Sequence, residues 1–395
     1  MKRQSILCFF AALLLSAFGY EFIYFIMTLH IYDLCKNALN VGVFTALTFI
    51  PKLFSALIGG ISDKMGKSKC FAFSAIMLSA LLFLLSRVTD IRLVYVIWLT
   101  ASIFFTAIVN IRGSLMADII SSEFYTSGNS VVLSLLNAAK LLGPLLGGSI
   151  IMLLNIKLLI YCTCLVYLIV AILSSLIKLK GRTTENESGF LENVKQGFHF
   201  MRVNNMFALL TSIAFFWRLF LGLQLSLFVI YIKDYLSGTD KQYGYFITAM
   251  GIGSIIGSLL APYVTKFMKQ GRMIILGLTL HYASFIALGV CRSYYGALCI
   301  IFFGYMIFYI TLVVMHSIRD ITTPNHIRSS AYGTTTTILT PPAIVSMLVG
   351  GSLADYFGVE TVIFYAGLLA LISLFWLLNW GSRKGILHTK EMFPM

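Results

Sequence analysis

The sequence predicts an all-α integral membrane protein of twelve transmembrane helices, arranged as two pseudo-symmetric six-helix bundles. Its composition supports this class, because 59% of the 395 residues are hydrophobic and only 11% are charged, whereas a soluble domain carries about 25% charged residues. In addition, apolar runs of about 18 residues or more, each long enough to cross a hydrocarbon core of about 30 Å, recur along the whole chain. A soluble fold cannot bury so much apolar surface.

Twelve apolar runs meet this length requirement. The first resembles a secretory signal, but its apolar run is longer than the usual 7–15 residues and no small-residue cleavage site follows, so we expect it to be retained. The remaining runs are separated by short polar segments. In order, the predicted spans are 5–32, 40–62, 70–87, 93–117, 129–154, 156–178, 206–232, 243–266, 273–291, 294–318, 330–354 and 360–381.

The longest polar stretch divides the chain into two halves of six spans. Asp118 and Gly147-Gly148 recur in the second half as Asp320 and Gly350-Gly351 at nearly equal spacing, and secondary transporters are often built from such repeats. Chance recurrence of glycine pairs in apolar helices is the alternative. We therefore predict an N-terminal bundle over 1–178, a cytoplasmic linker over 179–205 that can form an amphipathic surface helix, a C-terminal bundle over 206–381 and a cytoplasmic tail over 382–395.

The distribution of basic residues predicts the orientation. Most of the 29 Lys and Arg residues fall in segments on the same side as both termini, and cytoplasmic segments hold an excess of such residues. We expect a multi-pass protein of a bacterial inner or other plasma membrane, with both termini in the cytoplasm. The net charge of +14 favours contact with anionic lipid headgroups and not with nucleic acid. We expect a monomer.

The sequence lacks the residues that several classes of protein function require. The seven cysteines are scattered without ligand spacing, so neither a disulfide framework nor a metal site is predicted. Gly66-Lys67-Ser68 resembles the end of a phosphate-binding loop, but Ile61 stands where that motif needs glycine and a membrane helix precedes it. With no catalytic cluster at one membrane face, we expect no enzyme and no cofactor. Any transport must then be driven by an ion gradient, by the substrate's own gradient or by a partner subunit.

The segment GGISDKMGKSK over 59–69 resembles the signature loop between the second and third helices of the major facilitator superfamily. Ile61 replaces the usual leucine and Ser68 a usual basic residue. The resemblance implies a transporter in which the loop engages an acidic residue at the end of the fourth helix and braces the outward-facing state. The alternative, that the loop lysines only follow the inside rule, leaves Asp63 unexplained. The implied gating residues are Gly59, Asp63, Gly66, Lys67, Arg112 and Asp118, although Arg112 lies too near Asp118 to match the family's mid-helix arginine and can snorkel to the cytoplasm.

The segment LGPLLGG over 142–148 resembles the GPxxGG element of the family's drug or metabolite:proton antiporters, which are mostly exporters. Gly143, Pro144, Gly147 and Gly148 occupy its positions.

Glycines at four-residue spacing allow a second helix to approach closely. Gly143 and Gly147 have this spacing in the fifth span, and Gly253 and Gly257 repeat it in the eighth. Pro144 frees a backbone carbonyl and can bend the helix. The resemblance implies that the fifth and eighth helices pack across the interface between the halves and slide there. A static packing groove is the alternative.

Five ionisable side chains fall within predicted spans: Glu21, Lys52, Arg112, Lys140 and Arg218. Each charge costs about 2.5–3.5 kcal/mol at a helix centre unless it pairs or meets water, so packing does not explain them. Glu21 is the only interior carboxylate and suits a proton carrier. Its alternative role is that of a structural partner for Lys140, Lys52 or Arg218.

The surplus of interior cations predicts the sign of the substrate. One carboxylate neutralises one cation, so the cavity keeps positive charge and favours an anionic or zwitterionic compound over a lipophilic cation. We assign Lys52, Asn137, Lys140 and Arg218 to the substrate cavity. His281, in the ninth span, is expected to be a satisfied polar residue and not a proton relay.

Together these features predict a proton-coupled exporter of a small organic compound, such as a drug or a siderophore-like metabolite, that works by alternating access. An importer of an anionic nutrient or iron chelate with the same fold is the alternative. A non-transporting membrane receptor or an enzyme is a remote one.

Overall fold

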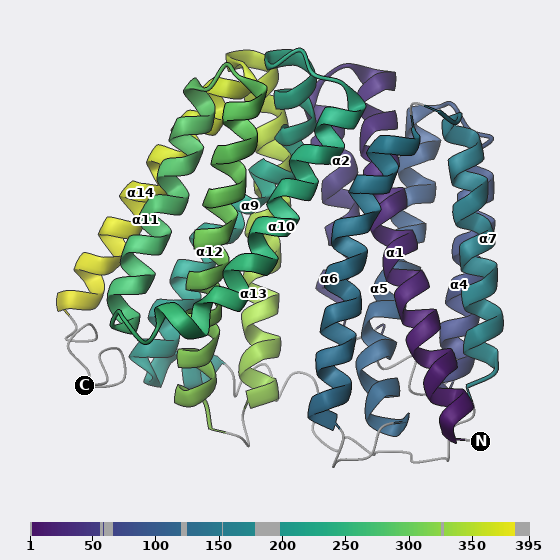
Figure 1. Cartoon of the computed structure of the whole chain (residues 1–395), viewed down its shortest axis with the longest axis horizontal. Coiled ribbons are helices and arrows are strands. Elements are labelled where there is room, and N and C mark those ends of the chain that lie inside the picture. Colours follow the sequence, from purple (N-terminus) through teal and green to yellow (C-terminus); the bar gives the residue numbers. More distant parts are fainter. Residues whose placement is uncertain are drawn as a thin grey trace. The chain divides into compact units, whose positions relative to one another are not determined.

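The computed structural model describes residues 2–55, 58, 66–119, 125–151, 153–177, 198–324 and 328–383. Within these ranges every regular element is a helix (Figure 1). The elements are α1 (Lys2–Cys35), α2 (Ala38–Phe49), η1 (Ile50–Phe54), α4 (Lys67–Leu85), α5 (Ile91–Ile119), α6 (Tyr125–Ile150), α7 (Ile156–Ser175), α9 (Asn205–Ile230), η3 (Tyr231–Tyr235), α10 (Asp240–Val264), α11 (Gln270–Val290), α12 (Tyr294–Thr322), α13 (Arg328–Phe357) and α14 (Val359–Arg383).

Eleven helices of the described residues are long and apolar enough to cross a membrane, and Ala38–Phe54 is a shorter apolar helix. All twelve coincide with predicted spans. The second differs from the expected continuous helix over 40–62, because α2 ends at Phe49 and continues as the 3-10 turn η1. Pro51, at the start of that turn, has no N–H to donate to the preceding turn, which ends the α-helix there.

Contacts divide the chain into two compact units. The first comprises Met1–Lys36, Phe44–Glu185 and Asp240–Thr248, and the second comprises Asn37–Val43, Asn186–Thr239 and Ala249–Met395. The division follows the two halves of the sequence except at two helix starts. The beginning of α2 groups with the second unit, and the beginning of α10 groups with the first.

In the first unit, α1 packs against α6 and α7, and α4 packs against α5 and α7. Buried hydroxyls tie these helices together: Tyr167 on α7 donates to the carbonyl of Ser16 at 3.0 Å, and Ser79 on α4 donates to that of Cys164 at 3.0 Å. Trp98 is fully buried and its indole N–H donates to the Thr48 hydroxyl at 2.9 Å. These three buried polar groups are therefore satisfied within the bundle, as a lipid environment requires.

In the second unit, α9 packs against α13 and α14, and α11 packs against α12 and α14. Its core is aromatic and aliphatic and includes Phe220, Tyr282 and Phe308. The start of α2 joins this unit through Asp355 near the end of α13. The Asp355 carboxylate accepts hydrogen bonds from the backbone N–H groups of Ala38 at 2.7 Å and Leu39 at 3.0 Å, and so satisfies two donors that a helix start leaves unpaired.

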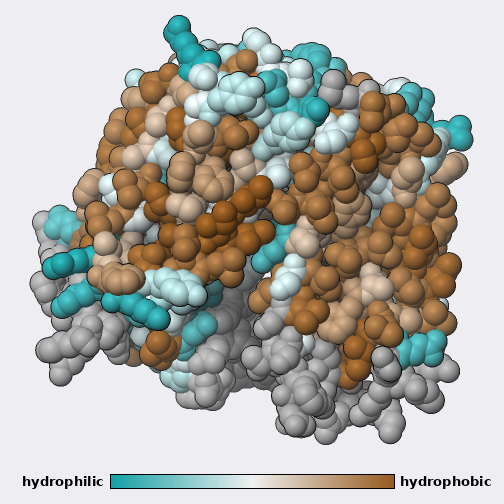
Figure 2. All heavy atoms as spheres, in the orientation of Figure 1, coloured by the Kyte–Doolittle hydropathy of each residue, from teal (hydrophilic) through white to brown (hydrophobic). Residues whose placement is uncertain are grey.

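Side-chain hydropathy changes along the length of the helices. Figure 2 shows apolar side chains over the middle lengths of the helices on the visible face and hydrophilic ones gathered near helix ends. Exposed side chains in the middle of helices include Ile76, Leu165, Leu280 and Phe375. Apolar surface of this kind is stable against lipid and not against water.

Candidate substrate and coupling site

Glu21 lies on α1 with two basic residues around it. The positive charges that act on its carboxyl group are those of Lys140 on α6 and Lys52 in η1. The sequence left open which of three cations accompanies Glu21. The structure brings these two to it, from elements that are far apart in the chain.

The helix that carries Lys140 approaches α1 at Glu21 itself. A Cβ atom added to Gly143 would stand 2.7 Å from the Cβ of Glu21, and one added to Gly147 would stand 2.7 Å from Cδ1 of Phe25. Real Cβ atoms essentially never come this close to their neighbours, so a larger residue at either position requires a neighbouring atom to shift. From the first contact to the second, the residue number rises by four on both helices. The two helices therefore run parallel and pack along one face of each.

Lys52 and Lys140 differ in their surroundings. The Lys52 ammonium lies 3.6 Å from the centroid of the Phe49 ring, a cation–π contact that orients the side chain. Lys140 is exposed, and so is Asn137 one helical turn before it, so both polar side chains are offered on one face of α6. This face can bind an anionic group while Glu21 stays beside it.

Arg218 belongs to the second unit, on α9, whereas Lys52, Asn137 and Lys140 belong to the first. Its guanidinium carbon lies 5.3 Å from the centroid of the Trp217 ring. Its Nε atom is buried and has no hydrogen-bond partner among the described residues. An unpaired buried donor costs free energy until an acceptor reaches it.

The residues assigned to gating are described only in part. Gly59 and Asp63, and the side chain of Asp118, lie outside the described residues. Gly66 has a φ of +87°, a conformation that favours glycine, and directly precedes α4, which begins at Lys67. Arg112 is partly buried on α5.

Ser68, which replaces a basic residue of the signature loop, has a contact of its own. Its hydroxyl lies 2.5 Å from the carbonyl oxygen of Ser174 and 3.1 Å from that of Ile177. The start of α4 is therefore bound to the end of α7.

The remaining motif glycines divide between two contacts. Gly148 on α6 meets Gly244 near the start of α10, where an added Cβ would stand 2.9 Å from the Gly244 Cα atom. Gly253 and Gly257, expected to pack towards the fifth span, lie against α12 instead, on the backbone carbonyls of Phe302 and Met306. The fifth and eighth spans do meet, through Gly148 of the motif and Gly244, which the motif comparison did not single out.

His281 lies in a fully buried aromatic setting on α11. Its Nδ1 atom is 3.0 Å from the carbonyl oxygen of Gly304, so Nδ1 carries the proton and donates it. The Nε2 atom is buried without a partner among the described residues. The expectation of a satisfied polar residue is therefore correct for only one of its two ring nitrogens.

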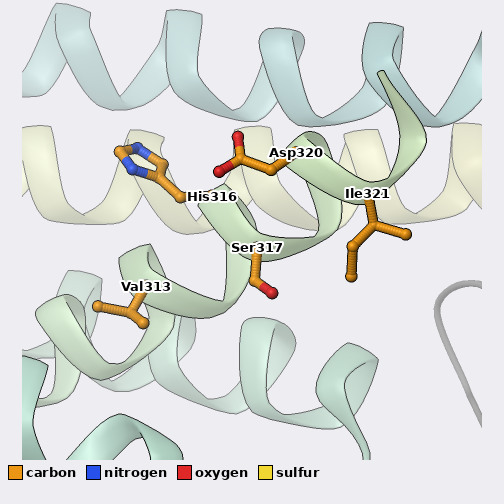
Figure 3. Close-up of a pocket in the computed structure, with 5 residues that line it drawn as sticks. All are labelled: Val313, His316, Ser317, Asp320 and Ile321. Atoms are coloured by element: carbon orange, nitrogen blue, oxygen red, sulfur yellow. The ribbon is translucent and has the colours of Figure 1, made fainter. Parts of the chain in front are cut away.

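Sequence reasoning missed a polar pocket on α12. Val313, His316, Ser317, Asp320 and Ile321 line it, and its volume is about 600 Å³. The side chains of His316 and Asp320 project from the same side of the helix, and the Asp320 carboxylate points towards the His316 ring (Figure 3). The four-residue spacing of a histidine and an aspartate is a signal in the sequence, but the predicted tenth span ends at residue 318 and leaves Asp320 outside it.

Comparisons with known proteins agree with this architecture. A family model described as Major Facilitator Superfamily matches residues 9–340, and no curated protein matches the sequence significantly. Among solved structures, the chain is similar to the nucleoside transporter NupG, with 11% identity over 95% of this chain and 99% of that one and a TM-score of 0.82. It is also similar to the POT family transporter PepTSo, with 10% identity, 97% and 98% coverage and a TM-score of 0.78.

A bacterial homologue of the human lysosomal transporter Spinster, in an inward-facing and occupied conformation, is 11% identical over 96% of both chains, with a TM-score of 0.77. At these identities the similarity shows the fold alone. The predicted twelve-helix class is confirmed.

Proposed function

Since this chain belongs to the Major Facilitator Superfamily, we propose that it is a proton-coupled exporter of a small organic compound that carries a carboxylate or a similar anionic group. It is a multi-pass membrane protein and a transporter by family. The LGPLLGG segment supports placement among the drug or metabolite:proton antiporters. A bacterial plasma membrane, cytoplasmic termini and a monomeric state complete the proposal.

The grouping of Glu21 with Lys140 and Lys52 carries this proposal. A carboxyl group away from bulk water avoids its charge by binding a proton or by pairing with a cation. Here both options are present at one place, and the close α1–α6 contact at Gly143 holds them together. Movement of a proton onto Glu21 changes the charge that the lysines present to a substrate.

The charged groups of the substrate determine whether the proton and the substrate move in the same or in opposite directions. When Glu21 binds a proton, its lysine partner loses a counter-charge and attracts an anion more strongly. A purely anionic substrate therefore binds together with the proton, which drives both in the same direction. A substrate with an ammonium group competes with the proton for Glu21, and this competition is what exchange requires.

Export by proton exchange therefore favours a zwitterion, with its ammonium group at Glu21 and its anionic group at Lys52 and Lys140. The same cluster supports a second candidate function, uptake of a simple anion together with a proton. In both cases the proton gradient supplies the energy.

Proton flux in proteoliposomes separates these functions. The purified chain is reconstituted with a pH-sensitive dye inside, and vesicles are loaded with amino-acid-like zwitterions or with mono- and dicarboxylates, then diluted. Exchange predicts that the interior becomes more acidic as the zwitterion leaves, whereas co-transport of an anion makes it more alkaline. Transport of lipophilic cations in preference to both classes would contradict the charge argument.

A further inference from the structure

The connection between α10 and α11 is short and held by backbone hydrogen bonds. α10 ends at Val264 and α11 begins at Gln270 (Figure 1). Because both helices are long and apolar enough to cross a membrane, the residues between them lie at a membrane surface. The backbone N–H groups of Phe267 and Met268 both donate to the carbonyl oxygen of Val264, at 3.0 and 3.2 Å. The backbone of this turn therefore fixes which of its side chains point outward.

Two aromatic side chains point outward at this turn. Phe267 is 89% exposed, and Tyr263, one helical turn before it, is 62% exposed. The Lys266 ammonium lies 5.6 Å from the centroid of the Tyr263 ring, within the range of a cation–π contact. Aromatic side chains at the end of a membrane span commonly lie at the level of the lipid headgroups.

The neighbouring helix α14 adds a tryptophan at the same end of the second unit. A Cβ atom on Gly289 would stand 2.6 Å from the Cβ of Phe364, and one on Gly367 would stand 2.9 Å from the backbone nitrogen of Ile286. Between these contacts the residue number falls on α11 and rises on α14, so the two helices are antiparallel. Trp376, which is 61% exposed on the later part of α14, therefore lies towards the start of α11.

Three basic residues accompany the exposed aromatic side chains. Lys266, Lys269 and Arg272 follow one another at intervals of three residues, and all three are exposed. Within the described ranges their side chains form no ion pair with a carboxylate. The sequence also contains no Asp or Glu between Asp240 and Asp320. The turn therefore presents three positive charges that no acidic residue of α10, α11 or their connection offsets.

From this arrangement we propose that the turn between α10 and α11 binds the phosphate headgroup of an anionic lipid. Lys266, Lys269 and Arg272 contact the phosphate, and Phe267 lies among the acyl chains directly below it. A negatively charged headgroup on an apolar chain matches both properties of the turn. A soluble acidic partner would match the charges and leave the apolar side chains in water. The site does not depend on the direction of transport or on the role of Glu21.

Lysine acetylation in nanodiscs tests this site on the unmodified chain. The full chain is placed in phosphatidylcholine, with or without phosphatidylglycerol, treated briefly with acetic anhydride and analysed by peptide mass spectrometry. We expect phosphatidylglycerol to slow the acetylation of Lys266 and Lys269 by about fivefold, as for one contact between a basic residue and an anionic surface. Lys241, an exposed residue at the opposite end of α10, is the internal control and should be slowed much less. Equal slowing of all three lysines would indicate a general surface potential and overturn the site.

Two matched variants test the contribution of charge to lipid affinity. Each removes three exposed basic residues, and binding of each lipid in detergent is followed by native mass spectrometry. The first variant combines Lys266→Gln, Lys269→Gln and Arg272→Gln. The second changes the second residue of α5, α7 and α10, and combines Arg92→Gln, Lys157→Gln and Lys241→Gln.

The first variant should bind phosphatidylglycerol about a hundredfold more weakly, since three contacts of about fivefold each are lost. Its binding of phosphatidylcholine should stay unchanged, and the second variant should bind both lipids like the parent chain. Equal phosphatidylglycerol affinity in the two variants would overturn the proposal. Slower acetylation of Lys266 and Lys269 on addition of inorganic phosphate to neutral nanodiscs would overturn it as well, because the site would then take a free anion and not a lipid.

Discussion

Gly143 of α6 lies directly against Glu21 of α1, so that a Cβ atom on the glycine would stand 2.7 Å from the Cβ of the glutamate. A glycine of the segment that resembles an antiporter motif is thus in direct contact with the candidate proton carrier. This relationship gives the motif a physical purpose, because it keeps Lys140 and Glu21 on adjoining surfaces.

Gly143→Leu should separate α6 from α1 at Glu21. Overpacking of this kind costs about 1–3 kcal/mol, so we expect a lower thermal unfolding temperature in detergent and a loss of transport. Leu146→Met, at an exposed position of the same helix, is the matched control. An unchanged unfolding temperature in the Leu variant would show that the helices do not pack as closely as described.

Glu21→Gln keeps the shape of the side chain but removes its charge and its proton. We expect substrate-linked pH changes in proteoliposomes to disappear, because no group that binds and releases a proton remains at this position. Asp33→Asn is the control on the same helix, because Asp33 forms an exposed pair with Lys36 at 2.7 Å. Coupling that persists in Glu21→Gln would move the proton role to another group.

Lys140→Met should weaken the binding of substrates that carry an anionic group. A hydrogen bond between charged groups contributes about 1.5–3 kcal/mol, so the apparent affinity should fall by at least about tenfold. Lys157→Met, on an exposed residue of α7, controls for the loss of one positive charge. Equal effects of the two changes would indicate a general surface charge effect.

Asp355→Ala should destabilise the junction of α13 with the start of α2. The carboxylate caps two backbone N–H groups of α2, and loss of such a cap costs about 1 kcal/mol. We expect a lower unfolding temperature and faster amide hydrogen exchange at Ala38 and Leu39. Tyr356→Phe, at the next and highly exposed position, should leave both unchanged.

The membrane spans were predictable because the property that defines them is local. An apolar run of sufficient length must be helical in lipid whatever it packs against, and all twelve spans correspond to helices of the structure. The end of the α-helix of the second span after Phe49 also has a local cause, Pro51. A hydropathy pattern does not detect it, because hydropathy does not depend on the missing backbone N–H.

The partners of the glycines were not predictable in the same way. Gly143 and Gly253 have the same spacing to a second glycine, yet the first meets α1 and the second meets α12. A small residue permits a close approach without specifying which helix approaches. That choice is made by the connection of the helices and by the shape of every neighbouring side chain.

The sequence by itself determined the membrane class, the family and the presence of costly charges within the spans, because hydropathy, motif and charge can be read one segment at a time. Only the tertiary structure decided that Lys140 and Lys52 are the charges beside Glu21, and that Gly143 is the glycine packed against it. Electrostatic pairing depends on distance in space, and Glu21 and Lys140, which are more than a hundred positions apart in the sequence, come close only when the helices pack.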